Sequence, residues 1–268
     1  DYNNDGLMDI YITDMHSDMS ETVGPGKEKL KANMQYPESL LNRGGVPSIY
    51  GNAFFENTGD GEFKEISDVI GAENFWPWGL SAGDLNADGW EDVFIASSMN
   101  FPFRYGINTV LLNNRGQSFL DSEFILAVEP RRDRRTTAPW FELDCSGADK
   151  KNDFCENLEG RVVITGALGS RSSVIFDVDG DGDLDIVTND FNSEPMVLIS
   201  NLTDRRKIQY MKVQLAGAQS NRSGLGATVR VTVDSNTITK VMDGQSGYLS
   251  QSIFPLYFGL DEASTVDR

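Results

Sequence analysis

The feature that most constrains this chain is a nine-residue acidic loop motif that occurs three times. Each copy has Asp or Asn at positions 1, 3 and 5, Gly at position 6 and Asp at position 9. The copies begin at Asp1, Asp84 and Asp177, and each runs directly into an apolar, strand-like segment. Three copies in register are not expected by chance, so the sequence predicts a fold built from repeats.

The residue types in these loops point to calcium, which prefers several oxygen ligands. Gly at position 6 permits the sharp turn that aims alternate oxygens inward. Position 7 is expected to offer its backbone carbonyl. The sequence therefore predicts three calcium sites, with these ligands: Asp1, Asn3, Asp5, Leu7 and Asp9; Asp84, Asn86, Asp88, Trp90 and Asp92; Asp177, Asp179, Asp181, Asp183 and Asp185.

The spacing of the loops excludes an EF-hand. An EF-hand has a bidentate Glu at position 12 and flanking helices, whereas position 12 here is Ile12, Ile95 or Thr188. Magnesium is disfavoured because it keeps its waters and uses fewer protein ligands. The third loop has four carboxylates at positions 1, 3, 5 and 9, where the others have three and an Asn. On ligand charge alone, the third loop is expected to bind calcium most tightly.

A second motif follows each loop at a variable distance, as a strand that ends in Asn, in residues 52–63, 108–119 and 195–201. The unit is then strand, loop, strand, connection, strand, turn, strand, which is the pattern of a β-propeller blade. In the second unit the strands are expected near Trp78–Gly83, Asp92–Ala96, Thr109–Asn113 and Ser118–Asp121.

The predicted fold class is all-β, with two domains. Propeller blades are expected in residues 1–207, with insertions at 17–50 and 123–160, and a small antiparallel β domain in residues 208–268. A short helix is expected within 26–41, broken at Pro37. Because Asp1 begins the chain inside a loop motif, we expect a strand to precede it in a longer protein.

Charge and cysteines limit the environment. The chain has 41 acidic and 23 basic residues, a net charge of −18, which disfavours binding to nucleic acid or to an anionic membrane surface. No apolar run approaches the ~20 residues of a membrane-spanning helix, so direct membrane insertion is not expected. Cys145 and Cys155 are predicted to form a disulfide, which implies an oxidising compartment, and two unpaired thiols are the alternative.

Enzymatic motifs are weak, and no catalytic residue is predicted. Gly79-Leu-Ser-Ala-Gly83 matches the Gly-x-Ser-x-Gly pattern, but that motif needs a strand-to-helix turn and a histidine. Here the segment runs into an acidic loop, and the chain has one histidine, His16. Trp76 and Trp78 are interpreted as packing residues rather than as a platform for sugars.

The loops and their flanking strands resemble the integrin-type FG-GAP (VCBS) repeats over about residues 1–205. The C-terminal segment resembles the ASPIC/UnbV domain, through residues 221–227, 244–252 and 256–260. In this order, the two parts are similar to the cartilage acidic protein family. The resemblance implies a seven-bladed propeller that is incomplete in this chain, an extracellular location, calcium binding, and a role in adhesion or matrix interaction.

Two functions are weighed. The first is a calcium-stabilised adhesion or protein-interaction module, with calcium mainly structural; it is secreted, or periplasmic or on the cell surface in a bacterium. The second is a carbohydrate-binding or polysaccharide-active propeller protein. The expected partner is therefore an extracellular protein or a glycan, and glycan binding that disappears with a chelator would favour the second function.

Overall fold

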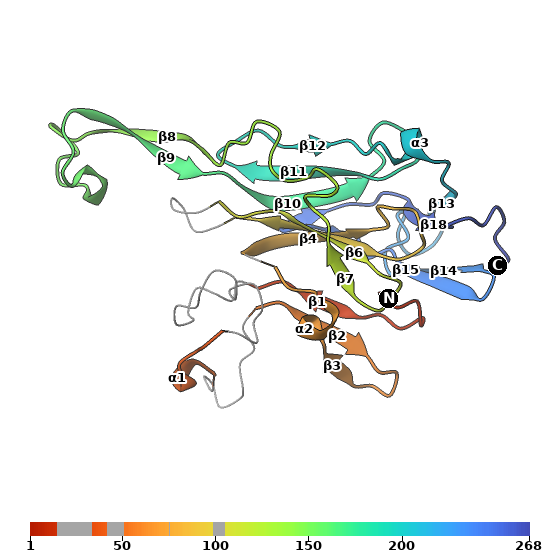
Figure 1. The fold of residues 1–268 in the computed structure, drawn as a ribbon. Helices are drawn as coiled ribbons and strands as arrows, with labels where there is room; N and C mark the ends of the chain where they lie inside the picture. Colours follow the sequence, from red (N-terminus) through yellow and green to blue (C-terminus); the bar gives the residue numbers. More distant parts are fainter. Residues whose placement is uncertain (15–33, 42–50, 75, 99–104) are drawn as a thin grey trace.

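The computed structural model describes residues 1–14, 34–41, 51–74, 76–98 and 105–268, and these are nearly all β. Three antiparallel sheets form the body (Figure 1). The first contains β1 (Ile10–Ile12), β2 (Ala53–Asn57) and β3 (Phe63–Glu65); the second contains β4 (Pro77–Gly83), β5 (Asp92–Ser97), β6 (Thr109–Asn113) and β7 (Phe119–Asp121); the third contains β10 (Gly169–Phe176), β11 (Asp185–Phe191) and β12 (Val197–Leu198).

The second sheet confirms the predicted blade. Its four strands are hydrogen-bonded in chain order, β4-β5-β6-β7, and their bounds agree with the expected ones within one residue. The acidic loops join β4 to β5 and β10 to β11, and the first loop leads into β1. All three loops lie at the same end of the body, near the N-terminus in Figure 1.

The second sheet is buried on both faces, which is why β5 is apolar throughout. Val93 and Ile95 pack into one cluster with the first sheet, around Phe54. Phe94 and Ala96 point the other way, into a cluster with the third sheet. Side chains that alternate along a strand serve opposite faces, so this single strand belongs to two cores.

Polar contacts fix the sheets to one another as well. The Ser81 hydroxyl of β4 lies 2.8 Å from that of Ser173 in β10. The Asn113 side chain at the end of β6 donates to the carbonyl of Tyr2, a residue of the first acidic loop, at 2.8 Å. Neighbouring sheets are therefore joined near the loops by buried hydrogen bonds, as expected for adjacent propeller blades.

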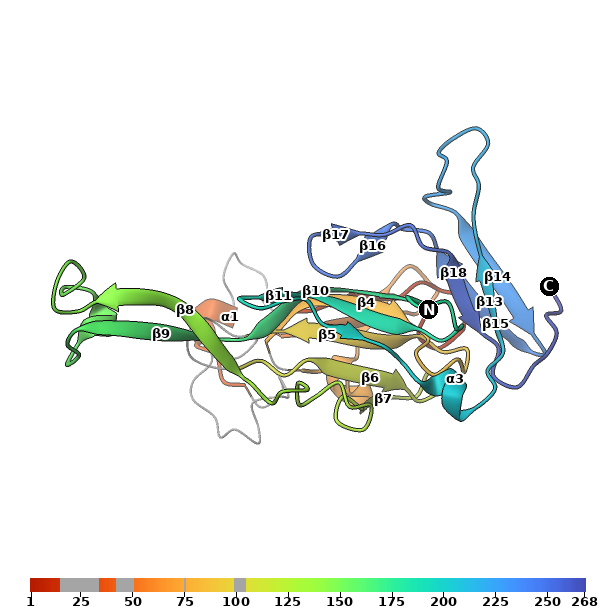
Figure 2. The same cartoon turned by 90° about the horizontal axis from the view of Figure 1, so that it is seen from above.

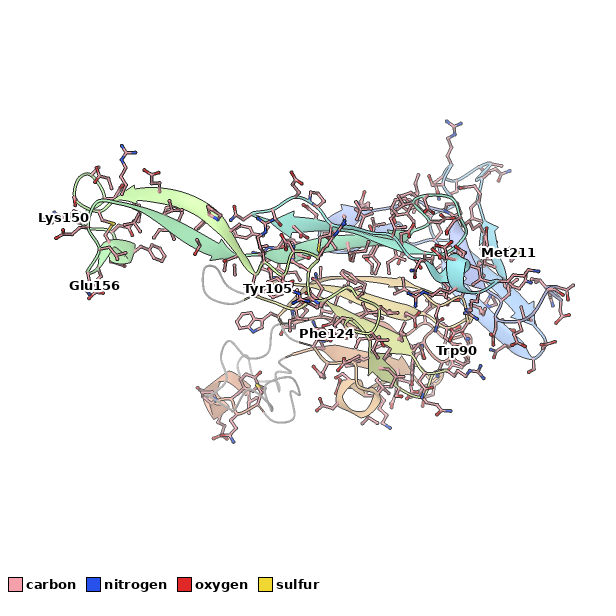
Figure 3. All side chains as sticks on the ribbon, turned by 45° about the horizontal axis from the view of Figure 1, so that its top comes forward. Trp90, Tyr105, Phe124, Lys150, Glu156 and Met211 are labelled. Atoms are coloured by element: carbon pink, nitrogen blue, oxygen red, sulfur yellow. A yellow bond between two sulfur atoms is a disulfide. The ribbon has the colours of Figure 1, made fainter. Side chains whose placement is uncertain are left out.

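A long arm leaves the body at the end opposite the loops (Figures 1 and 2). It is the hairpin of β8 (Thr137–Asp144) and β9 (Arg161–Ala167), so it extends past residue 160, the expected end of the insertion. Its tip carries a 3₁₀ turn, Asp153–Cys155, and the predicted Cys145–Cys155 disulfide, which is confirmed. Lys150 and Glu156 mark this tip, far from Trp90 and Met211 (Figure 3).

The C-terminal segment is an antiparallel β unit, as predicted. It pairs β13 (Tyr210–Val213) with β18 (Leu256–Gly259), β14 (Thr228–Val233) with β15 (Asn236–Val241), and β16 (Gln245–Ser246) with β17 (Ser250–Gln251). Val231, Ile238, Phe258 and Leu260 form its core. Figure 2 places β13, β14, β15 and β18 at the loop end of the body.

Helices are short: α1 (Glu38–Leu41), α2 (Ser67–Ile70) and α3 (Leu202–Arg205). Pro37 precedes α1 rather than breaking it, and its carbonyl accepts from the Leu41 amide. His16 and most of the insertion expected at 17–50 fall outside the described residues. Across the described chain, none of the helices has the length and apolar character needed to cross a membrane.

Candidate metal centres

The three acidic loops share one hydrogen-bonded frame. The carboxylate at position 1 accepts from the amide of the Gly at position 6, at 3.2 Å in Asp1, 2.8 Å in Asp84 and 3.0 Å in Asp177. The carboxylate at position 5 accepts from the amide at position 7, at 2.8 Å, 3.0 Å and 3.1 Å in loop order. These bonds hold alternate side chains on the inside of the turn, as the motif predicts.

Two positions in each loop have a left-handed backbone. The position 6 glycines have φ of 86°, 85° and 106°, a region that glycine enters without steric cost. Position 4 is also left-handed, with φ of 53° at Asn4, 55° at Ala87 and 81° at Gly180. Position 4 has no signature in the sequence, because Asn, Ala and Gly have no side-chain type in common.

The carboxylate at position 9 ties each loop to its sheet. It accepts from the position 2 amide, at 2.9 Å in Asp9, 2.8 Å in Asp92 and 2.7 Å in Asp185. Its other oxygen accepts from a backbone amide at or just past the end of the neighbouring strand: β2 for the first loop, β6 for the second and β12 for the third. These donors are Asn57 at 3.0 Å, Asn113 at 2.7 Å and Ser200 at 2.7 Å.

These donors explain the second sequence motif and correct it at one position. Asn57 and Asn113 are the strand-terminal residues that the motif identified, but the third equivalent is Ser200 and not Asn201. The amide makes this contact, so the side-chain type can vary. The motif is therefore a second anchor of the acidic loop.

The third loop brings its carboxylates closest together. One oxygen from each of Asp177, Asp179 and Asp185 lies within 4.8 Å of the others, close enough to share one cation. Asp183 at position 7 is buried, and its Oδ1 has no hydrogen-bond partner within the described part of the chain. A buried carboxylate oxygen without a partner is costly, so this loop has the donor chemistry of a cation site.

Thr203 of α3 closes the third loop, and sequence reasoning missed it. Its amide donates to Asp183 Oδ2 at 2.9 Å and its hydroxyl contacts Asp181 and Asp183. The hydrogen bond from this hydroxyl holds the pKa of Asp181 below its usual range. Asp183 was expected to contribute only its backbone carbonyl, but its side-chain Oδ2 accepts hydrogen bonds from Thr203 of α3.

The second loop is the most deeply buried. Asp84 and Asp92 are almost fully inaccessible, whereas Asp179 and Asp181 of the third loop are exposed. Burial raises the pKa of Asp84 to about 7 and raises the pKa of Asp92 well above its usual range. Neighbouring carboxylates add to both shifts. A bound cation would stabilise the charged form of these groups, so the residues of the second loop also fit a metal.

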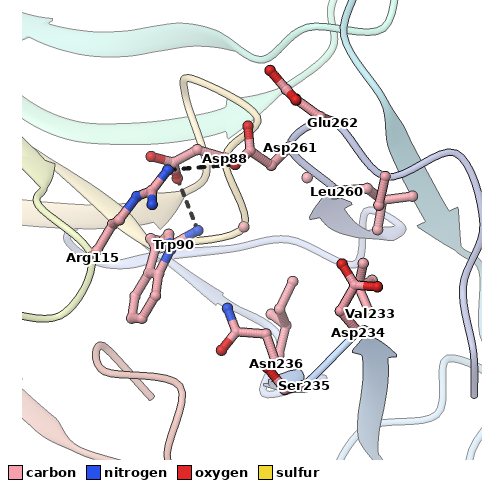
Figure 4. A pocket seen from close by; sticks show the side chains of 14 residues that line it. Asp88, Trp90, Arg115, Val233, Asp234, Ser235, Asn236, Leu260, Asp261 and Glu262 are labelled. Atoms are coloured by element: carbon pink, nitrogen blue, oxygen red, sulfur yellow. Dashed lines mark hydrogen bonds and ion pairs between the residues drawn. The ribbon is translucent and has the colours of Figure 1, made fainter.

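The C-terminal domain covers the second loop. A Cβ on Gly259 of β18 would lie 2.0 Å from Asp84 Oδ2, so only glycine permits this approach. The Asp261 amide donates to the Ala87 carbonyl at 3.1 Å. Beside this contact lies a cavity of about 560 Å³ (Figure 4), with Arg115 and Asp261 3.6 Å apart at its edge. Its lining comes from the loop on one side and from β14, β15 and β18 on the other.

The structure thus keeps the predicted ligands as three separate groups, each within its own loop. The first two loops are linked, because the Asn4 side chain donates to the Gly89 carbonyl at 3.0 Å. The other sequence candidates have packing contacts. Ser81 lies inside β4 rather than at a strand-to-helix turn, Trp76 is buried, and the Arg171 guanidinium covers the Trp78 ring at 3.8 Å.

Comparison with protein families agrees with both halves of this architecture. An FG-GAP-like repeat matches residues 1–95, which span the first two acidic loops. An ASPIC and UnbV model matches residues 217–268.

The chain combines an FG-GAP-like repeat with an ASPIC and UnbV domain. The third sheet lies outside both matches and repeats the same loop frame. A comparison with curated proteins found no significant match.

Proposed function

We propose that this protein is a calcium-binding extracellular β-propeller that serves as an adhesion or protein-interaction module, with calcium in a structural role. The observation that carries the proposal is the shared loop frame. In each loop, carboxylates at positions 1, 5 and 9 hold the same amides, and the side chains between them supply further oxygens. The disulfide supports an oxidising compartment, since such bonds persist in secreted and periplasmic proteins.

The residues that would hold the ions are the side chains at positions 1, 3, 5 and 9 and the carbonyl at position 7. When bound, calcium would neutralise carboxylates that otherwise repel one another at the blade ends. Hydrogen bonds within the chain add to this stabilisation, because the carboxylates of Asp9, Asp92 and Asp185 join each loop to its sheet. Calcium therefore supports the stability of the blades and leaves the binding of partners to other surfaces.

Chelation tests this proposal. Adding EDTA to protein equilibrated with calcium is expected to lower the melting temperature. A site at 100-fold excess over its dissociation constant contributes about 2.7 kcal/mol. The effect should shrink in Asp88→Asn, which weakens the second loop, and stay unchanged in Glu159→Gln, an exposed residue of the arm. A melting temperature insensitive to EDTA would contradict the structural role of calcium.

The arm is the surface that best fits a protein partner. Leu143, the disulfide and the partly buried Phe141, Val162 and Ile164 form a cluster of its own, separate from the blades. Beyond that cluster it exposes apolar side chains: Trp140 by 41%, Leu158 by 44% and Val163 by 54%. Apolar groups gathered on a projecting element are typical of interaction sites.

Removing the arm separates binding from stability. Pro139 and Thr165 are paired across the hairpin, so residues 140–164 can be replaced by an Asn-Gly turn. We expect the melting temperature to change by only a few degrees, because the deleted cluster is separate from the blade cores. In a pull-down from an extracellular fraction, proteins captured by the full chain should no longer be captured by the chain without the arm. Capture unaffected by the deletion would place the partner site elsewhere.

Carbohydrate binding is the second candidate, favoured by aromatic rings near the base of the arm. Trp140 and Tyr248 are each 41% exposed, and Trp140 lies 6.2 Å from the Phe191 ring. Stacking on sugar faces needs such rings. Glycan-array binding that is lost in Trp140→Ser would favour this role over a protein partner.

A further inference from the structure

The C-terminal domain places a lysine on the third acidic loop. Lys212 lies on β13, and its ammonium forms an ion pair with Asp177 Oδ2, the position 1 carboxylate. The Asp177 side chain is only 3% exposed, so this contact is shielded on the carboxylate side. Among the ion pairs of the described residues, this is the one in which a lysine or arginine side chain contacts a predicted ligand carboxylate.

The position of Lys212 is fixed by its neighbours on β13. A Cβ on Gly182 would lie 2.5 Å from the Tyr210 ring, so this ring rests directly on the loop backbone. Tyr210 in turn stacks on Tyr257 of β18, with 5.4 Å between ring centroids. The Lys212 ammonium lies 5.4 Å from the centre of the Tyr210 ring. The ammonium therefore stands at the loop because the domain is seated there.

The other basic groups near the loops differ from Lys212 in what they contact. Lys240 pairs with Glu91, which is not a predicted ligand. Arg206 donates to the Asn86 carbonyl, and Arg115 pairs with Asp261 at the cavity edge. Among the described residues, no lysine or arginine forms a direct ion pair with a ligand carboxylate of the second loop, although Lys240 and Arg115 oppose through space the burial that raises the pKa values of Asp84 and Asp88.

Charge then decides the order of affinities. The third loop has four carboxylates at positions 1, 3, 5 and 9, and the Lys212 ammonium reduces this charge to the three of the other loops. An ion that binds Asp177 must also displace or share this partner. Both effects oppose the expectation, drawn from ligand charge alone, that the third loop binds calcium most tightly.

We propose that Lys212 is a built-in competing cation that sets the calcium affinity of the third loop and links it to the seating of the C-terminal domain. The inference rests on the proposed calcium function. Because Lys212 belongs to β13, calcium that displaces its ammonium removes one contact between the domain and the blade. By reciprocity, a domain seated through this contact weakens calcium binding at the third loop.

Calorimetric titration of the whole chain with calcium tests the proposal in matched variants. Lys212→Met should raise the affinity of one site about fivefold, the factor that corresponds to a partly exposed ion pair. Lys212→Arg keeps the charge and should remain near the wild type. Lys207→Met is the control, because Lys207 is an exposed lysine three residues before β13. Asp179→Ala disables the third loop and should abolish the effect of Lys212→Met.

The outcomes distinguish this inference from the function on which it rests. Calcium binding that is present but equal in Lys212→Met and Lys207→Met would overturn the inference alone. A gain in affinity that persists when Asp179→Ala is added would also overturn it, because another site would be responsible. If no variant, including the wild type, binds calcium, the proposed function itself fails and the inference fails with it.

Discussion

The second and third acidic loops have the same motif and frame but differ in their surroundings. The second loop lies under the C-terminal domain, and its Asp84 and Asp92 are almost fully buried. The third loop leaves Asp179 and Asp181 exposed and receives a hydroxyl from Thr203 and an ammonium from Lys212. The same nine-residue motif thus forms a buried centre in one blade and, in the next, a centre that is partly exposed and paired with a lysine.

This difference shows that ligand identity does not fix the properties of such a loop. Burial raises the pKa of Asp84 to about 7, while a hydroxyl hydrogen bond lowers the pKa of Asp181. Burial disfavours the charged form at Asp84 and Asp92 of the second loop and also at Asp185 of the third, whereas the Thr203 hydroxyl supports the charged form at Asp181. We therefore expect the second loop to depend more on its own hydrogen bonds and on a cation for stability.

The largest expected effect comes from removing the position 9 carboxylate. In EDTA, Asp92→Ala leaves the Leu85 and Asn113 amides unpaired, at a cost of about 4 kcal/mol in the free energy of unfolding. Asp185→Ala makes the same change in the third loop and should cost about 2 kcal/mol, because Val178 is exposed and Ser200 is half-buried, whereas Asn113 is buried. Urea denaturation measures the free energy of unfolding of both variants. Equal losses would contradict the claim that the second loop depends more on its buried hydrogen bonds.

A smaller effect should come from the position 6 glycines, and here the third loop is the more sensitive. Gly182→Ala adds backbone strain and a clash with Tyr210, for a loss of about 2 kcal/mol. The Cβ added in Gly89→Ala would lie 3.2 Å from Ile238 Cδ1 and 3.3 Å from the Gly259 carbonyl oxygen, which is less close than the contact with Tyr210, so this substitution should cost about 1 kcal/mol.

Adding Tyr210→Ala tests the cause of the larger loss at Gly182. If the clash is responsible, Gly182→Ala should cost less in the Tyr210→Ala background than in the wild type. Additive losses would show that the ring does not rest on the loop.

The smallest effect concerns position 4, where exchanging residues between the loops should change stability in opposite directions. Ala87 has φ of 55°, and Ala87→Gly is expected to raise the free energy of unfolding by about 0.5 kcal/mol. Gly180→Ala imposes the same strain on the third loop and should lower it by about 1 kcal/mol. Thermal unfolding in EDTA compares them, and shifts of the same sign would contradict the left-handed geometry.

Much of the fold could be predicted from the sequence, because the residues that determine the strands and loops are close together in the chain. The two repeated motifs predicted all four strands of the second sheet, and the spacing of Asp and Gly predicted the three loop frames. Two cysteines ten residues apart predicted the disulfide of the arm. Each of these features depends on residues close in the chain, whose geometry follows from residue type and spacing.

The tertiary structure decided what lies around each loop. Thr203, Lys212 and Gly259 reach the loops from 20 to 175 residues away, and nothing in their local sequence marks them as neighbours of carboxylates. Ser200 replaces the expected Asn because an amide makes the contact, and an amide leaves no signature in residue type. The sequence by itself determined where oxygen ligands gather. The packing of the C-terminal domain decided that Asp84 is covered by Gly259 and that Asp177 is paired with the ammonium of Lys212. Desolvation and ion pairing depend on distances in space, and those distances exist only once the chain has folded.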